Sequence, residues 1–228
     1  MTHTLRDRCA IVGVGATAQG KLPGSSALSL GVAAFKRALD DAGLHKEQID
    51  GLLTFSGQTA AEGQQHYLRM GETLGLNPRW TGTLYMGGAT AGALVQQAAL
   101  AINAGMATHV ACVYGDAAAT GGGVFNRPQG WGDSSAIWGF MSAAANSAIT
   151  AARHMAVYGT TSRQLAEVAV ACRRHASLNP DAVMRKPITL KTTRHRAGSS
   201  SRCASWTAAW SATAVFASSS PALNARAI

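Results

Sequence analysis

Acidic side chains are scarce in this chain of 228 residues, and they are absent from its last 38 positions. The chain has 20 Lys and Arg against 11 Asp and Glu, which gives a formal net charge of +9. Residues 1–190 hold 15 of the basic and all 11 of the acidic residues, so residues 191–228 add +5. No basic stripe is interleaved with aromatic residues, which argues against a nucleic-acid-binding protein. A basic tail without a pattern attracts polyanions only nonspecifically.

Cysteine is also sparse and badly spaced for a metal or disulfide framework. The four cysteines are Cys9, Cys112, Cys172 and Cys203. None forms a CxxC pair and none has a histidine at the spacing of zinc ligands, so we expect no metal site. No signal peptide is recognisable at the amino end, and the sparse cysteines fit a reducing compartment. We therefore expect a cytoplasmic protein.

Two long stretches have no charged side chain at all. They lie between Arg79 and Asp116 and between Ser134 and Ala152. Both are rich in Gly, Ala, Ser, Gln and Asn rather than in Leu, Ile and Phe. This composition is typical of helices inside a large folded domain, so we expect no membrane span.

Apolar runs of strand length alternate with helical patterns along residues 1–190, which predicts an α/β fold with a mostly parallel sheet. The run HVACVY at 109–114 is almost wholly apolar and is expected at the centre of that sheet. The expected strands are 9–14, 49–55, 80–85 and 109–114, and the expected helices are 26–42, 64–76, 87–103, 136–158 and 161–175. Residues 117–160 form a loop and helical insertion, whose Gly-rich part at 117–135 is too long for a plain connection.

The pattern Gly13-x-Gly15-x-x-Ala18 after the first strand resembles a dinucleotide-binding fingerprint. However, Lys-Leu-Pro-Gly at 21–24 intervenes before the helix, and the second strand has no acidic residue at its end. We therefore interpret these residues as turn glycines without a cofactor. A nicotinamide-dependent dehydrogenase remains a distant alternative.

The segment at 85–90, Tyr-Met-Gly-Gly-Ala-Thr, is the best candidate for a chemical site. Its residues Gly87, Gly88, Ala89 and Thr90 open a long helix directly after a strand. Backbone N–H groups at such a point stabilise an oxyanion or a thioester oxygen. Close helix packing, which only Gly and Ala allow, explains the same residues equally well.

Other polar residues form weaker candidates. Tyr114 and Asp116 follow the central strand, while His154 and His175 lie on predicted helices and are expected to be surface or capping side chains. No Ser-His-Asp or Cys-His set can be assembled from the spacing, so no catalytic residue is assigned with certainty.

In order and sequence, residues 1–190 resemble the N-terminal half of thiolase-superfamily proteins, closest to the sterol-carrier-protein-X and lipid-transfer type. The matching segments are AIVGVG at 10–15, AAFKRALDDAG at 33–43, IDGL at 49–52, GGATAGAL at 87–94, SRQLAEV at 162–168 and MRKPITL at 184–190. The resemblance implies a thiolase-like α/β half with buried and covering helices and with the C-terminal half missing.

The resemblance also implies acyl-CoA processing in lipid or sterol side-chain metabolism, of the acetyl-CoA acetyltransferase kind. Members carry a nucleophilic cysteine where a strand meets a buried helix. Gly88 or Ala89 holds that place here, and no cysteine occurs between residues 10 and 111. This departure favours a retro-aldol lyase, because an acyl-thioester needs a thiol.

Such a lyase is expected to take a CoA thioester as substrate, with no tightly bound cofactor, and to work beside a small OB-fold partner that binds acyl-CoA. The full-length form is expected to be a homodimer. The remaining alternative is a noncatalytic dimerisation or scaffold module, so whether this chain is an enzyme stays open.

Residues 191–228 read as the product of a frameshift. Ser and Ala make up 18 of these 38 residues. In a shifted reading frame, each codon consists of the last base of one codon and the first two bases of the next. The shifted codon across Trp206 and Thr207 then always encodes Asp, and the one across Ala209 and Trp210 always encodes Leu, Met or Val. With GC-rich codon choices, the second frame continues the thiolase-like pattern after residue 190. We therefore expect a truncated chain, inactive alone, with a disordered tail.

Overall fold

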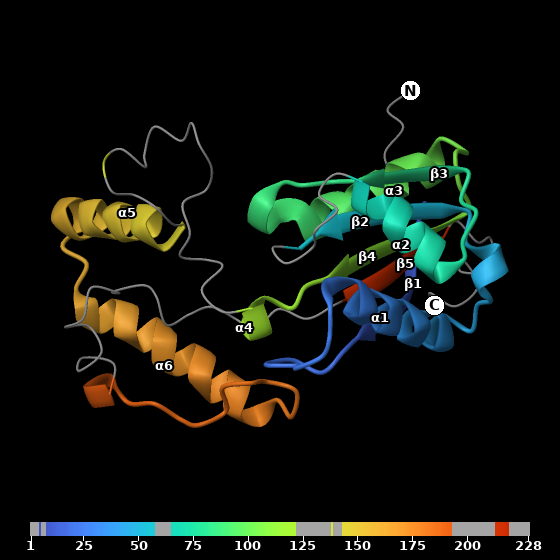
Figure 1. The fold of residues 1–228 in the computed structure, drawn as a ribbon. Helices are drawn as coiled ribbons and strands as arrows, with labels where there is room; N and C mark the ends of the chain where they lie inside the picture. Colours follow the sequence, from blue (N-terminus) through green and yellow to red (C-terminus); the bar gives the residue numbers. More distant parts are fainter. Residues whose placement is uncertain are drawn as a thin grey trace, which may run out of the picture. The chain divides into compact units, whose positions relative to one another are not determined.

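The computed structural model describes residues 5, 8–57, 65–121, 138, 143–192 and 213–218. The chain groups into two compact units. One comprises Met1–Gly121 with Trp210–Ile228, and the other comprises Gly122–Ala209. The first unit holds a five-stranded sheet and its covering helices, and the second holds two long helices (Figure 1).

Four of the five strands run in the same direction, as expected for the predicted mostly parallel sheet, and β5 runs against them. The strand order is β1-β5-β4-β2-β3, so β4 is the central strand. Strand β2 pairs in parallel with both β3 and β4, while β5 runs antiparallel between β1 and β4. The strands are β1 Ala10–Ala16, β2 Gly51–Ser56, β3 Trp80–Thr83, β4 His109–Gly115 and β5 Thr213–Ser218.

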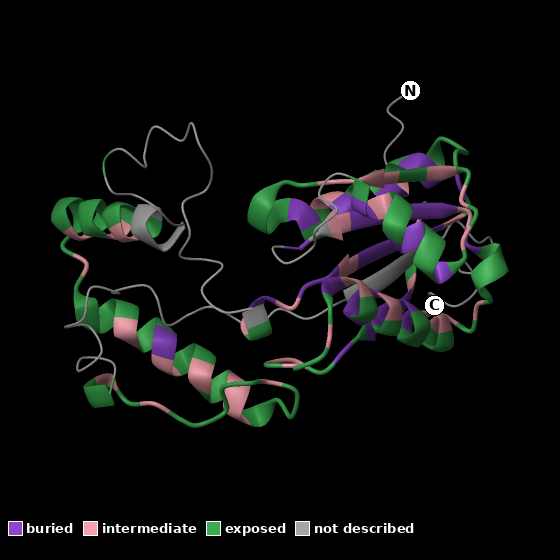
Figure 2. Cartoon of the chain, in the orientation of Figure 1, coloured by how far each residue is buried: buried purple, intermediate pink, exposed green. Residues whose placement is uncertain are grey.

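Helices cover both faces of the sheet, because successive side chains of each strand point to opposite sides. On one face, Leu52 and Val113 pack in a cluster with residues of α1 (Ala27–Ala42) and α2 (His66–Leu74). On the other face, Leu53 and Cys112 pack with residues of α3 (Thr90–Asn103). The buried residues therefore concentrate along the central strands and the helix sides that face them (Figure 2).

Helix α1 begins and ends within one residue of where the sequence predicted, because capping residues stand at both ends. Ser26 is the N-cap and forms a capping box with Ser29, and Gly43 ends the helix in the left-handed conformation with φ of 63°. Both features satisfy backbone groups that a helix leaves unpaired at its ends. A short 3-10 helix, η1 at Lys46–Gln48, then leads to β2.

The glycines of the fingerprint-like motif are not turn residues, which corrects that interpretation. Gly13 and Gly15 lie inside β1, where α1 packs directly on the strand. A Cβ on Gly15 would overlap the backbone of Ala34 and Ala38, and a Cβ on Gly13 would overlap that of Ala38. The motif therefore serves close helix–strand packing and implies no nucleotide.

Helix α3 differs from the expected buried helix, because only one side of it is covered. Leu94, Ala98 and Ile102 are buried against the sheet. Ala91 and Gly92 are exposed on the same helix, and Leu100 is 42% exposed. The helix therefore presents a second, uncovered side, which carries the polar residues Gln96, Gln97 and Asn103 beside these small and apolar ones.

The second unit contains α5 (Ala143–Tyr158) and α6 (Ser162–Leu178). The predicted capping box is present, since Thr161 and Gln164 bond reciprocally at the start of α6. Helix α6 continues past His175 to Leu178. Of the Gly-rich stretch at 117–135, Ala118–Gly121 forms the short helix α4 and residues 122–135 lie outside the described residues.

Six residues of the tail correct the expectation of disorder. Thr213–Ser218 form β5, paired with both β1 and β4. Residues 193–212 and 219–228 lie outside the described residues. Among the residues that the structure describes, no helix has the length and apolar character needed to cross a membrane.

Candidate functional site

The candidate site lies where the three parallel strands β2, β3 and β4 end. Because these neighbours run in the same direction, their carboxyl ends meet at one edge of the sheet. Ligands of open α/β sheets bind outside this edge. The segments that follow the strands supply the polar groups: Gly57 after β2, residues 84–90 after β3, and Asp116 after β4.

The predicted turn is present and forms a single 3-10 turn, η3 at Gly87–Ala89, directly before α3. Gly87 has a φ of +56°, a conformation that favours glycine. The amide of Ala89 donates to the carbonyl of Met86 at 3.2 Å. Gly87, Gly88 and Ala89 are exposed, so the turn is open to a ligand.

Thr90 has a structural task within this turn. Its side chain is buried, with 1% exposure. The Thr90 hydroxyl accepts a hydrogen bond from the amide of Met86 at 2.9 Å and donates to the carbonyl of Gly87 at 2.7 Å. Thr90 therefore holds the turn closed, and its hydroxyl is occupied within the chain.

Two backbone donors remain at the turn. Within the described part of the chain, no acceptor is found for the amides of Gly87 and Gly88. They stand at the positive end of the 14-residue helix α3, where partial charge favours an anion. A Cβ on Gly88 would meet nothing within 4 Å, so the space beside this residue is open.

None of the described cysteines stands at the turn. Cys112 points into the packed interior, and burial raises its pKa to about 12. Cys9 is half-buried, and burial raises its pKa above the ordinary value despite the nearby charge of Arg8. Cys172 is exposed on α6, in the other unit. The turn itself is formed by Gly87, Gly88 and Ala89.

Three aromatic rings line the same edge, and the sequence analysis did not group them. The rings of Phe55 and Tyr114 stack with centroids 4.9 Å apart and an interplanar angle of 16°. The ring of Tyr85 is tilted against Phe55 at 5.5 Å. We call Tyr85, Phe55 and Tyr114 the aromatic strip. Each is the last residue of a predicted strand, so the signal was present in the sequence.

Tyr114 and Asp116, two weak candidates, are brought together at the inner end of the strip. The Tyr114 hydroxyl donates to a carboxylate oxygen of Asp116 at 3.1 Å, and Asp116 is only 1% exposed. Burial raises the pKa of Tyr114 far above its ordinary value, and the charge of Asp116 and this hydrogen bond raise it further. Tyr114 therefore stays neutral and keeps its proton.

The two candidate histidines lie on helices of the second unit, as predicted. His154 Nδ1 lies 2.9 Å from the Thr160 hydroxyl, and its ring contacts Tyr158. It lines an open cavity of about 520 Å³ together with residues of α5 and the start of α6. His175 lies in the last turn of α6. No group of three His, Cys, Asp or Glu suited to a metal occurs among the described residues.

No family model matches the chain, but two curated proteins do. It is 34% identical over 194 residues to a steroid side-chain-cleaving aldolase of Thermomonospora curvata, covering 80% of this chain and 48% of that protein. It is 35% identical over 199 residues to a 17-hydroxy-3-oxo-4-pregnene-20-carboxyl-CoA lyase of Mycobacterium tuberculosis, covering 82% of this chain and 50% of that protein. The chain thus spans about half the length of the curated relatives it matches.

Solved structures agree with this similarity. An Ltp2-ChsH2(DUF35) aldolase matches with a TM-score of 0.73 and 32% identity, over 95% of this chain and 57% of that one. A monomeric SCP2-thiolase-like protein of Mycobacterium smegmatis matches in fold, with a TM-score of 0.68 and 15% identity over 96% of this chain and 47% of that one. The chain therefore has a thiolase-like fold, and its sequence is similar to about half of a steroid side-chain-cleaving aldolase and of a carboxyl-CoA lyase.

Proposed function

We propose that this chain is part of a lyase that breaks a carbon–carbon bond beside a CoA thioester by a retro-aldol reaction. The observation that carries the proposal is the turn at Gly87–Thr90, which offers backbone donors for an oxyanion at a place without a thiol. An acyltransferase of the acetyl-CoA acetyltransferase kind needs a thiolate there. The relatives named as an aldolase and a lyase support the same choice.

The chemistry follows from the donors. In a retro-aldol step the β-hydroxyl of the substrate loses its proton to a base, and its oxygen becomes a carbonyl. The bond between the α and β carbons breaks, and its electrons move onto the thioester as an enolate. The enolate then takes a proton at its α carbon, which gives the shorter acyl-CoA. In this proposal the amides of Gly87 and Gly88 stabilise the enolate oxygen, and the positive end of α3 adds to that effect.

The CoA thioester is then a substrate and not a resident cofactor. The names of the relatives point to a steroid side chain as the acyl group, which fits lipid metabolism. A cytoplasmic location is part of the proposal and rests on the sparse, unpaired spacing of the cysteines. The solved aldolase is named together with a second protein, ChsH2(DUF35), which supports a small acyl-CoA-binding partner with an OB fold for this chain. A homodimer is part of the same proposal.

We propose further that the 228 residues bind substrate but do not turn it over unaided. The described donors stabilise charge, while the proton acceptor of the step is not assigned to any described residue. A noncatalytic association module is the second candidate, because α3 leaves one side uncovered, on which Leu100 is 42% exposed. Light scattering with a co-purified partner tests that candidate.

The reaction type can be tested with 17-hydroxy-3-oxo-4-pregnene-20-carboxyl-CoA, the compound in the name of one relative. The chain is assayed with and without the small partner, and with and without added CoA. A retro-aldol lyase releases a 17-ketone and a shorter acyl-CoA without consuming CoA. Product formation that depends on added CoA would instead show thiolysis and contradict the proposal.

Substrate binding tests the turn itself. The noncleavable analogue 3-oxo-4-pregnene-20-carboxyl-CoA, which lacks the hydroxyl that reacts, is titrated against Gly88→Leu and Gly92→Leu. Both glycines are exposed and have open space where a side chain would begin. Only the first substitution covers the donors, so it should weaken binding about twofold to tenfold, as expected for the loss of a hydrogen bond to the neutral thioester oxygen. Equal effects of the two substitutions would remove the turn from the site.

A further inference from the structure

The aromatic strip is a preformed surface and not a chance gathering of rings. Phe55 and Tyr114 are direct partners in the parallel pairing of β2 with β4, so the sheet fixes their spacing. The hydroxyl of Tyr114 is fixed by Asp116. Gly57 closes the space behind that carboxylate, since a Cβ on Gly57 would lie 2.6 Å from Cγ of Asp116. Binding to this surface therefore needs little side-chain ordering.

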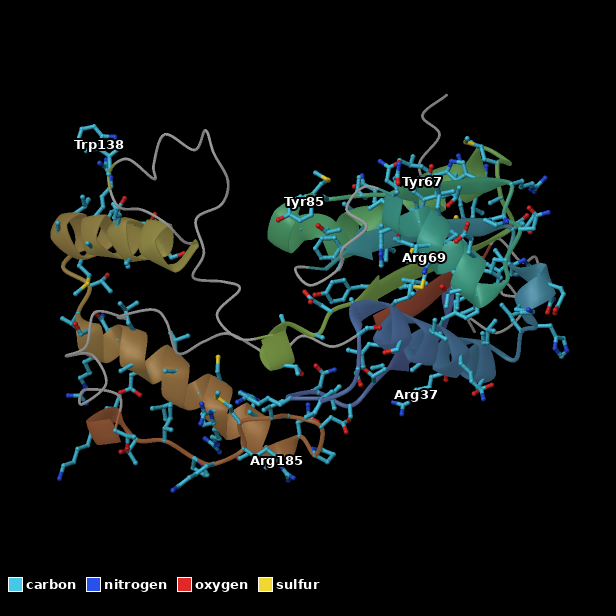
Figure 3. All side chains as sticks on the ribbon, viewed as in Figure 1. Arg37, Tyr67, Arg69, Tyr85, Trp138 and Arg185 are labelled. Carbon is cyan, nitrogen blue, oxygen red and sulfur yellow. The ribbon has the colours of Figure 1, made fainter. Side chains whose placement is uncertain are left out.

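The outer end of the strip lies beside the donors of the turn. Tyr85 is 58% exposed and is separated from Gly87 by one residue, Met86, which is 57% exposed. Figure 3 shows Tyr85 at the amino end of α3, the end that carries the turn. A thioester oxygen bound by the turn therefore has Tyr85 beside it, with Phe55 and then Tyr114 farther along the strip.

We propose that the aromatic strip is the acyl-binding surface of this site and that it selects rigid, fused-ring acyl groups over flexible linear ones. A fused-ring system has a broad apolar face that covers several aromatic rings at once. It also loses almost no internal rotation on binding, whereas a linear chain must order each of its bonds. The proposal rests on the function proposed above and adds the residues that recognise the acyl group.

The test compares two CoA esters that the chain cannot cleave, 3-oxo-4-pregnene-20-carboxyl-CoA and octanoyl-CoA, by equilibrium titration. Wild-type protein should bind the fused-ring ester more tightly. Tyr85→Ala should weaken the fused-ring ester about threefold to tenfold, the value of one aromatic contact, and leave octanoyl-CoA nearly unchanged. Tyr85→Phe keeps the ring and should restore the wild-type preference.

Tyr158→Ala is the matched control, because Tyr158 is 72% exposed and lies on α5 in the other unit. It should leave both affinities unchanged.

If the two esters bind equally, or if Tyr85→Ala weakens both to the same extent, the inference fails while the proposed function stands. If Tyr85→Ala instead changes only the association state of the chain, a protein partner covers the strip and the inference also fails. If neither ester binds, the proposed function fails, and the inference with it.

Discussion

Asp50 connects, through hydrogen bonds, three strands of the sheet that carries the candidate site. Its carboxylate accepts hydrogen bonds from the backbone of Thr108 and His109 and from the side chain of Arg79, at 2.8 to 3.2 Å. The Asp50 carbonyl accepts from the amides of Arg79 and Trp80. One residue thus joins the amino ends of β2, β3 and β4. Sequence spacing could not reveal this, because the partners lie up to 59 positions away.

Replacing Asp50 by alanine should cost about 2 to 4 kcal/mol of unfolding free energy, because several backbone donors lose a charged acceptor. Urea unfolding measures the loss. Asp40→Ala, at an exposed position of α1, is the control and should change the free energy by less than about 0.5 kcal/mol. A loss for Asp50→Ala no larger than for the control would show that this junction is not stabilising.

The pH dependence of this effect has a definite sign. Partial burial raises the pKa of Asp50, but the hydrogen bonds from His109, Thr108 and Arg79 lower it by more, so the net pKa is lowered. A carboxyl whose folded pKa is lowered stabilises fully above its unfolded pKa of about 3.9. That stabilisation disappears as the pH falls through the lower, folded pKa. The stability gap between wild type and Asp50→Ala should therefore shrink on acidification below about pH 4, and a gap that grows there would contradict the assignment.

Single-residue patterns predicted part of the candidate site. The Gly-Gly turn at 87–88 was visible because glycines between a strand and a helix mark a turn with open amides. The aromatic strip was not grouped, although its three members close three predicted strands. Joining them requires the order of β3, β2 and β4 in the sheet, which local periodicity does not encode.

At the scale of elements, α1 packs directly on β1, with the strand glycines Gly13 and Gly15 against the helix backbone. Gly15→Ala forces a Cβ onto the backbone of Ala34 and Ala38, which cannot yield as a flexible side chain would. We expect a loss of about 3 kcal/mol, at the upper end of the usual cost of overpacking. Thermal or urea unfolding measures it. Gly88→Ala is the matched control, because its added Cβ meets nothing within 4 Å and should cost little.

The same comparison separates the two interpretations of the Gly13-x-Gly15 motif. If the motif bound a dinucleotide, Gly15→Ala would change nicotinamide cofactor binding and leave the stability of the apo protein nearly intact. The close approach of α1 predicts the opposite result.

Most ends of helices were predictable from the sequence, since Ser26, Gly43 and Thr161 carry their capping chemistry in the local sequence. The place of β5 was not, because it depends on β1 and β4, which lie some two hundred and some one hundred residues earlier.

At the scale of the whole molecule, strand β5 shows that part of the tail at 191–228 belongs to the folded sheet. The tail has no alternation of apolar and polar residues, which led us to expect disorder, yet Thr213–Ser218 is placed between β1 and β4. In the described part of the chain, β1 pairs with no strand other than β5. Residues 213–216, Thr-Ala-Val-Phe, include β-branched and aromatic types that suit a strand, so tertiary context overrides the weak local signal.

The frameshift origin of residues 191–228 remains a prediction, and the gene tests it. We expect an open second frame after codon 190 that continues the thiolase-like pattern and itself contains a strand near the position of β5. Sequencing codons 188–232 decides the matter. A downstream region with no recoverable open frame would contradict the prediction and leave the tail as a native part of this protein.

The central claim is that the turn at the amino end of α3 holds a thioester beside a position that has lost its nucleophile. The most direct test restores the thiol, as Gly88→Cys and Ala89→Cys, and measures the intact mass after incubation with acetyl-CoA. Gly92→Cys on the exposed side of α3 is the control. A thiol at a helix amino end has a lowered pKa, so one of the first two variants should become acetylated while the wild type and Gly92→Cys do not. Acetylation of the wild type, or no more adduct at 88 and 89 than at 92, would contradict the account.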